Sequence, residues 1–166
     1  PAANWSNAYT VLTADGGVAG SFDNVSSNAG STFLSTEVDY GATAVTVQMA
    51  RNNVAFADYA VTANERAAAN ALDALPQSSA LYGAVVVQDG AGATEAFDAL
   101  SGDIHASLKT GLIEDSRYVR AAAFSRLEEA TGAPGFWLQP FGGWGTTDGD
   151  GNARGLDRST GGVLGG

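Results

Sequence analysis

Residues 136–166, FWLQPFGGWGTTDGDGNARGLDRSTGGVLGG, restrict the possible folds of this chain more than any other stretch. Trp137, Gln139 and Phe141 occupy alternate positions in the first half, and the second half, ARGLDRSTGG, has the composition of a returning strand. Between them, TTDGDGN is rich in the residues that form tight turns. The stretch therefore predicts a β-hairpin. Because an isolated hairpin is marginally stable in water and its free edges attract other strands, we expect partner strands that this chain does not contain.

Short strands and turns are also expected in the N-terminal part of the chain, up to about residue 58. A β-prone run at 9–12 precedes the turn sequence DGG, and a second run follows it. Further on, Val45, Val47 and Met49 alternate with polar residues, which is the period-two pattern of a half-buried strand. Short strands at irregular intervals, with Gly and Asn between them, favour a β-sandwich or the last rungs of a β-solenoid.

The spacing of apolar residues changes to that of helices between residues 62 and 130. Thr62 and Glu65 form a capping box at the start of one helix, which Pro76 ends. The apolar stripe of this helix consists of Ala68, Leu72 and Leu75. SALYGAVVV fits a short helix or a strand, and TEAFDALSGDIHASL predicts two helices separated at its central Ser-Gly. Residues 114–129 have the strongest helical pattern, with acids at the start and TGAP after the end.

Composition argues against several classes of function. The formal net charge of −10 opposes binding to nucleic-acid phosphates and to anionic lipid headgroups. No apolar run approaches the ~20 residues of a membrane-spanning helix. Cysteine is absent, which excludes a thiol nucleophile and a zinc knuckle, and we expect neither a metal nor a cofactor. Because the chain begins at Pro1 and has no signal peptide, we expect it to derive from a longer precursor.

Two short motifs resemble functional sites but are better explained by local structure. DGDGN spaces three oxygen-bearing side chains as a calcium loop does, yet Ala153 stands where glycine is needed and Ser159 where a bidentate glutamate is needed. We expect a solvated turn there. Ser101, Asp103 and His105 are the residue types of a hydrolase triad, but at one helix start they point in different directions. Helix capping and dipole roles suit the first two better.

The order of these segments resembles the junction region of bacterial autotransporters, the type V self-secreting surface proteins. YTVLTADGGVAGSF followed by VTVQMARN resembles the end of their secreted passenger. TANERAAANALDAL, LSGDIHASL and the helix ending in RLEEA resemble the segment that follows. WLQPFGGWGTTDGDGNARGLDRSTGGVLGG resembles the first two strands of the translocator β-barrel, whose remaining strands are missing here. Each motif is short, and their order carries the resemblance over nearly the whole chain.

The resemblance implies a mixed α and β fold in which the end rungs of a β-solenoid lead through helices to the first hairpin of an outer-membrane barrel. Its parts are a passenger end with an autochaperone-like role at 1–58, a helical junction at 59–113, a linker helix in the barrel pore at 114–134, and barrel strands at 135–166. The passenger end would nucleate folding outside the membrane. The candidate nucleus consists of Tyr9, Val11, Phe22, Phe33, Val38, Tyr40, Val45 and Val47.

A helix over 114–129 would be about 24 Å long, close to the ~25 Å apolar band of such a barrel. Alanines would make it slim enough for the pore, and its arginines would pair with Asp115, Glu128 and Glu129. The pore-helix candidates are Arg117, Arg120, Ala121, Ala122, Ala123 and Arg126, and the barrel-start candidates are Trp137, Phe141 and Trp144. For the excised chain, the alternative is a surface helix packed by Val119, Phe124 and Leu127.

The predicted function is therefore that of a non-catalytic module for passenger translocation and folding at the bacterial outer membrane and cell surface. Its expected partners are its own passenger, the missing barrel strands, the outer membrane and the barrel-assembly machinery, with no nucleic acid. One alternative is a secreted β-rich adhesin fragment. A second is a hydrolase, for which the sequence offers only the set around Ser101. The sequence does not indicate an oligomeric state.

Overall fold

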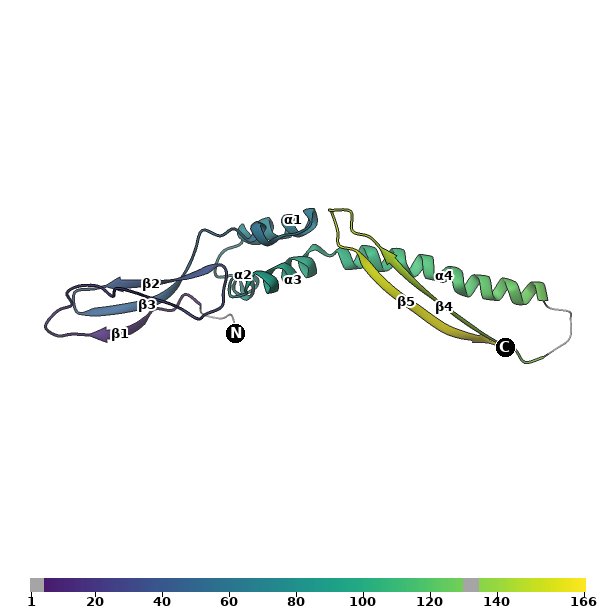
Figure 1. Ribbon diagram of the computed structural model, residues 1–166, viewed down its shortest axis with the longest axis horizontal. Helices are drawn as coiled ribbons and strands as arrows, with labels where there is room; N and C mark the ends of the chain where they lie inside the picture. Colours follow the sequence, from purple (N-terminus) through teal and green to yellow (C-terminus); the bar gives the residue numbers. More distant parts are fainter. Residues whose placement is uncertain (1–4, 130–134) are drawn as a thin grey trace. The chain divides into compact units, whose positions relative to one another are not determined.

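The computed structural model describes residues 5–129 and 135–166. It divides the chain into two compact units, Pro1–Ser101 and Gly102–Gly166. Figure 1 labels the helices and strands of both units. The boundary falls at the Ser-Gly pair where the sequence predicts a break between helices. Gly102 has a φ of 75°, a left-handed conformation that glycine adopts without a steric cost.

The first unit begins with a three-stranded sheet of β1 (Tyr9–Thr13), β2 (Leu34–Tyr40) and β3 (Ala44–Arg51). Its strand order is β1-β3-β2, and both ladders are antiparallel. The short connection after Tyr40 makes β2 and β3 a hairpin, closed by a hydrogen bond from the Gly41 amide to the Ala44 carbonyl (2.8 Å). Stacked solenoid rungs pair in parallel. The described strands show no such pairing, and the solenoid stays a prediction.

The helices of this unit are η1 (Phe56–Tyr59), α1 (Ala63–Asp73), α2 (Ala80–Val86) and α3 (Gly90–Ser101). The predicted capping box at α1 is confirmed: the Glu65 amide donates to Thr62 Oγ1 (3.1 Å), and Glu65 Oε2 accepts from the Thr62 amide (3.3 Å). SALYGAVVV contains a helix rather than a strand. Val85 and Val86 are buried in the core, so packing overrides the preference of β-branched residues for strands.

The core of the first unit lies among these helices and the start of β2. Phe33, Phe56, Phe97 and Val86 are fully buried, and the ring of Phe56 lies 4.7 Å from that of Phe33 and 6.0 Å from that of Phe97. On α1 the core residues are Glu65, Ala69 and Leu72. The predicted stripe on α1 was right for Leu72 and wrong for Leu75, which remains exposed.

The sheet is much less covered away from the helices. Among the predicted nucleus residues, Phe33 and Val45 are buried, and Val38 and Val47 are half-buried. The other four are exposed by 37–64% and are not core residues, namely Tyr9, Val11, Phe22 and Tyr40. Figure 1 shows the helices at the end of the sheet where β2 begins and β3 ends, and the core cluster there contains none of these four residues. Burial at the other end of the sheet is partial, because Val45 is buried there whereas Tyr40, with which it pairs, is exposed.

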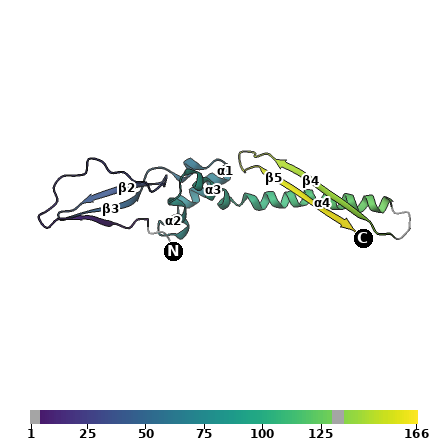
Figure 2. The ribbon, with the colours of Figure 1, turned by 60° about the horizontal axis from the view of Figure 1, so that its bottom comes forward.

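The second unit consists of α4 (Asp103–Glu129) and the hairpin of β4 (Leu138–Thr147) and β5 (Leu156–Gly165). The predicted hairpin is confirmed, with an unbroken antiparallel register from Leu138↔Gly165 to Thr147↔Leu156. Figures 1 and 2 both show the two strands running along α4. The predicted TGAP stop lies at residues 131–134, outside the described residues.

Helix α4 is longer than predicted. The sequence suggested separate helices on either side of residues 113 and 114, whereas α4 continues through both as one helix of 27 residues, about 40 Å long. No proline interrupts it, and its one internal glycine, Gly111, lies within hydrogen-bonded turns. The expected boundary between junction and linker therefore falls inside a single helix. Among the described residues, no helix is both long and apolar enough to cross a lipid bilayer.

Candidate functional site

The β4–β5 hairpin presents two faces that differ in their exposure to solvent. Side chains alternate between half-buried and exposed along both strands, with the half-buried ones on the side of α4. This inner face carries Gln139, Phe141, Gly143 and Gly145 from β4, and Leu156, Arg158, Thr160, Gly162 and Leu164 from β5. The outer face includes Leu138, Pro140, Trp144 and Val163, and towards the connecting turn Thr146, Asp157 and Ser159, all exposed. Of the barrel-start candidates, Trp144 is 88% exposed, whereas Trp137 and Phe141 are half-buried.

Glycines on the inner face allow α4 to approach the strands closely. A Cβ added to Gly143 would lie 2.2 Å from Tyr118 Oη and 2.4 Å from Tyr118 Cζ. On the helix, Gly111 is buried, and a Cβ there would lie 3.3 Å from Arg158 Nη1. Side chains of one surface thus fill the space left by glycines of the other.

Arg158 of β5 joins the strand to two consecutive acids of α4. Its guanidinium donates through Nη2 to Glu114 Oε2, and its Nε lies 3.4 Å from Asp115 Oδ1. The side chains of Arg158 and Asp115 are 18% and 20% exposed, so this pair is largely shielded from water, whereas that of Glu114 is 52% exposed. The arrangement fixes the rotation of α4 about its axis relative to β5.

The predicted pore-helix residues occupy several faces of α4. Ala122 is buried, whereas Ala121 and Ala123 are exposed, so only one of the three alanines provides a close contact. Arg126 lies over the Trp137 ring, with Cζ 5.8 Å from its centroid, close to the start of β4.

The two remaining arginines of this set bind within α4. Arg117 donates to Tyr118 Oη (3.1 Å) and Arg120 to Ser116 Oγ (2.6 Å). The sequence reasoning missed Arg158 and Tyr118. Alternation in LDRST could have placed Arg158 on one face with Leu156, but nothing in the sequence indicated which helical acids it meets.

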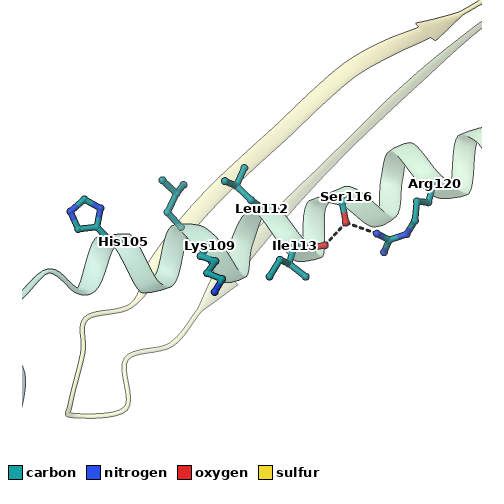
Figure 3. A pocket seen from close by; sticks show the side chains of 7 residues that line it. His105, Lys109, Leu112, Ile113, Ser116 and Arg120 are labelled. Atoms are coloured by element: carbon teal, nitrogen blue, oxygen red, sulfur yellow. Dashed lines mark hydrogen bonds between the residues drawn. The ribbon is translucent and has the colours of Figure 1, made fainter.

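A second surface of α4 is an open groove of about 610 Å³. Apolar Leu108, Leu112 and Ile113 line it together with His105, Lys109, Ser116 and Arg120 (Figure 3). Leu112 and Ile113 are more than 60% exposed. This surface of α4 therefore exposes both apolar and cationic side chains to solvent.

The residue types of a hydrolase triad have local roles. The Ser101 hydroxyl donates to the Asp98 carbonyl (2.7 Å) within the last turn of α3. Asp103 stands in the first turn of α4, where a carboxylate interacts favourably with the helix dipole. His105 is exposed on α4. The position of Asp103 agrees with its expected dipole role, whereas the N-terminal capping role expected for Ser101 stays a prediction, because this hydrogen bond lies at the end of α3.

The DGDGN sequence begins the connection between β4 and β5. Asp150 Oδ1 accepts hydrogen bonds from the amides of Asn152 (2.9 Å) and Ala153 (3.1 Å). The amide hydrogen bonds from Ala153 and Asn152 hold the pKa of the Asp150 carboxyl below its ordinary value. Within 5–129 and 135–166, no group of three or more His, Cys, Asp or Glu side chains is placed to hold a metal ion. The Asp150 carboxylate stabilises the turn.

In sequence, the chain is similar to a part of each of two larger proteins. It is 29% identical over 210 aligned positions to an extracellular serine protease of Serratia marcescens, covering 95% of this chain and 20% of that protein. A second extracellular serine protease of the same organism is 28% identical with the same coverage. The chain thus spans about a fifth of the length of these relatives. No family model matches the chain, and no solved structure matches it.

Proposed function

We propose that this chain is a non-catalytic secretion and folding module of the autotransporter type. In this proposal, β4 and β5 are the first strands of an outer-membrane β-barrel, and α4 occupies its lumen. Residues 1–58 are the end of the secreted passenger, and α1–α3 connect the two. The module supports export of the passenger and its folding outside the outer membrane.

The two-faced hairpin carries this proposal. Transmembrane β-strands alternate between side chains that face lipid and side chains that face a polar interior, and they are about 9–11 residues long. Each strand of the hairpin has 10 residues. Its outer face exposes Leu138, Trp144 and Val163, with the polar Asp157 and Ser159 towards the connecting turn. Its inner face offers Arg158 and Thr160 beside apolar side chains such as Phe141 and Leu164. A helix already covers the inner face, as a lumen helix would.

The strand edges support the same proposal. Among the described residues, β4 pairs only with β5, and each of these strands has its second edge without a ladder. Exposed edges of ten residues favour pairing with further strands. Outer-membrane barrels have at least about eight strands, so the proposal requires additional strands beyond this hairpin.

The comparisons support a secreted context. Both relatives are named as extracellular, and the alignment covers almost the whole chain but only a fifth of each relative. The relatives are also named as proteases, and in this proposal their catalytic residues lie outside the aligned fifth. The Ser101 hydroxyl donates to the Asp98 carbonyl, which supports a structural role for this residue.

The test is expression of the complete reading frame that contains this chain in a Gram-negative host. A folded barrel resists detergent until heated, so its mobility on an electrophoresis gel changes on boiling. We expect this change in the wild type and in Gln139→Lys, because position 139 lies on the inner face of the hairpin. Trp144→Lys should reduce the heat-modifiable fraction, because Lys on the lipid face costs about 2–4 kcal/mol at the bilayer midplane and less towards the interfaces.

Two outcomes would contradict the proposal. One is a wild-type protein that never shows heat modifiability although it is produced in full length. The other is an equal response to Trp144→Lys and Gln139→Lys, because a lipid-facing and a lumen-facing position must differ.

A further inference from the structure

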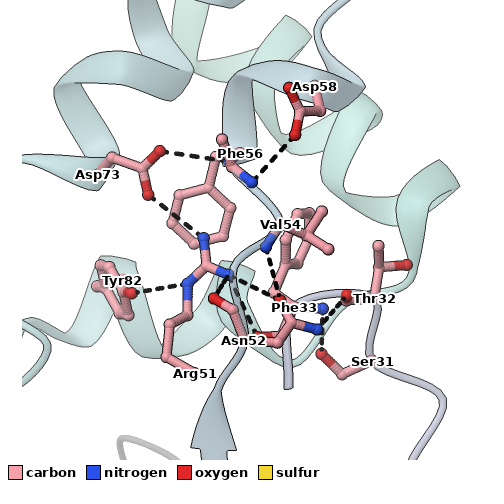
Figure 4. A network of polar contacts seen from close by, with 11 residues as sticks. Ser31, Thr32, Phe33, Arg51, Asn52, Val54, Phe56, Asp58, Asp73 and Tyr82 are labelled. Atoms are coloured by element: carbon pink, nitrogen blue, oxygen red, sulfur yellow. Dashed lines mark hydrogen bonds and ion pairs between the residues drawn. The ribbon is translucent and has the colours of Figure 1, made fainter. Parts of the chain in front are cut away.

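Arg51, the last residue of β3, joins three parts of the first unit that are far apart in the sequence (Figure 4). Its Nε donates to Tyr82 Oη on α2 (3.1 Å), and its Nη2 lies 3.5 Å from Asp73 Oδ1 on α1. Its Nη1 donates to the Phe33 carbonyl (3.3 Å) and to Oδ1 and the carbonyl of Asn52 (3.2 and 3.1 Å). One guanidinium at the end of the sheet thus binds the residue before β2, the loop after β3 and two helices.

The guanidinium also stacks on the aromatic core. Its Cζ lies 5.3 Å from the ring centroid of Phe33 and 4.7 Å from that of Phe56. The side chain of Arg51 is only 16% exposed. Cation–π contacts are stronger when they are shielded from water, so this stacking adds to the polar contacts.

The partners of Arg51 are themselves bound to the backbone. Asp73 Oδ2 accepts from the Phe56 amide (3.3 Å). Asn52 Oδ1 also accepts from the Val54 amide (3.0 Å), and Asn52 Nδ2 donates to the Thr32 carbonyl (2.9 Å). A change at Arg51 is therefore transmitted to the loops before β2 and after β3.

The buried core is unevenly distributed between the two sides of this network. The sheet side contributes Phe33 and Leu34 to the cluster of buried residues around the helices. The helical side contributes all the others, Phe56, Ala60, Ala69, Leu72, Tyr82, Val85, Val86, Ala93 and Phe97. These helices are close in sequence and hold most of the core, so their contacts form with a small loss of chain entropy.

We propose that Arg51 is a positioning residue that docks the three-stranded sheet onto a helical platform of η1, α1, α2 and α3, and that this platform keeps its structure when docking is weakened. The consequence for export rests on the proposed function. The platform follows the sheet in the sequence, so a chain exported C-terminal part first would present the platform before β3. The strands would then add to a surface that is already folded.

The test uses amide hydrogen exchange of the purified 166-residue chain, resolved by residue or by peptide. Arg51→Lys retains the positive charge but removes the planar fork that reaches several acceptors at once. We expect amide exchange in β2 and β3 to accelerate about tenfold or more. The variant loses several hydrogen bonds made by a charged group, and such bonds are stronger than neutral ones. Exchange in α1 and α3 should be unchanged. Arg66→Lys, on an exposed position of α1, is the matched control and should alter neither.

A second variant tests whether the contact to α2 is part of the docking. Tyr82→Phe keeps the ring and removes the oxygen that accepts from Arg51. It should accelerate exchange in the sheet less than Arg51→Lys does, and combining the two should add little to Arg51→Lys alone. Equal acceleration in sheet and helices, or complete loss of protection, would show one cooperative core and overturn the proposal. Unchanged exchange in the sheet would overturn it as well.

The result is independent of the test of the proposed function. Hydrogen exchange is measured on the purified chain, whereas heat modifiability is measured on the complete protein in its host. Either proposal can therefore fail while the other stands.

Discussion

Gly143 offers the most direct test of how α4 lies on the hairpin. The Cβ of Gly143→Ala would stand 2.2, 2.4 and 2.9 Å from three atoms of the Tyr118 phenol. Carbon atoms make favourable contacts only at about 3.5–4.0 Å, and Tyr118 Cζ, at 2.4 Å from the added Cβ, is about 1.1–1.6 Å too close. The ring therefore has to move by more than about 1 Å. The movement displaces Tyr118 from the space next to Gly143 that it fills in the wild type.

The expected cost is about 1–3 kcal/mol, the range typical of inserting a methyl group into a packed interface. This corresponds to a change of about 5- to 150-fold in the local equilibrium. Hydrogen exchange of the β4 and β5 amides at increasing urea concentrations gives the local free energy of unfolding. In a Tyr118→Ala background, the same alanine meets no phenol and should cost less than about 0.5 kcal/mol, so the two substitutions should be strongly non-additive.

Gly142→Ala is the matched control on the outer face. An added Cβ there meets only the Thr160 carbonyl oxygen at 3.4 Å and Gly161 Cα at 3.9 Å. Replacing a glycine where the backbone permits alanine usually stabilises by about 0.4–1 kcal/mol, because the unfolded chain loses freedom. Our reasoning about the helix contact would be refuted if Gly143→Ala were as well tolerated as Gly142→Ala, or if its cost were the same with and without Tyr118.

Two further predictions concern the core and the ion pairs. Phe97→Ala should lower the free energy of unfolding of the first unit by about 3–5 kcal/mol, whereas Phe22→Ala, at a residue that is 49% exposed, should lower it clearly less. Chemical denaturation of both variants measures the difference, and equal costs would contradict the location of the core. Arg158→Met should destabilise the contact between α4 and β5 only modestly through Glu114, because that side chain is half-exposed and exposed ion pairs contribute little. The loss of the pair with the more shielded Asp115 should contribute more. Raising the salt concentration should weaken this contact in the wild type and change it little in Arg158→Met, as followed by hydrogen exchange in β5; the same salt response in both would argue against the ion pairs.

Features that depend on residues close in sequence could be predicted well. The capping box needs only Thr62 and Glu65 at their spacing, and the hairpin needs two alternating runs around a turn rich in Asp and Gly. The break between α3 and α4 follows from Gly102, which takes up a positive φ. The local chemistry of these residues is sufficient to form each of these features.

Features that depend on distant partners could not be predicted in this way. Val85 and Val86 favour strands by their own preference, and only the aromatic cluster that buries them in α2 explains why the segment is helical. Tyr9 and Phe22 are of the residue types found in cores, but both are exposed and neither belongs to the cluster that packs around the helices. Burial is a property of what lies opposite a residue, and the residue alone does not specify it.

For the second unit, alternation in the sequence determined that each strand has two faces. The tertiary structure decided which of the two meets a helix, because glycines at 143 and 145 admit side chains that the exposed face has no need to accommodate. It also decided that Arg158 binds Glu114 and Asp115, 44 and 43 positions away, since an ion pair forms only where packing has already brought the two charges together.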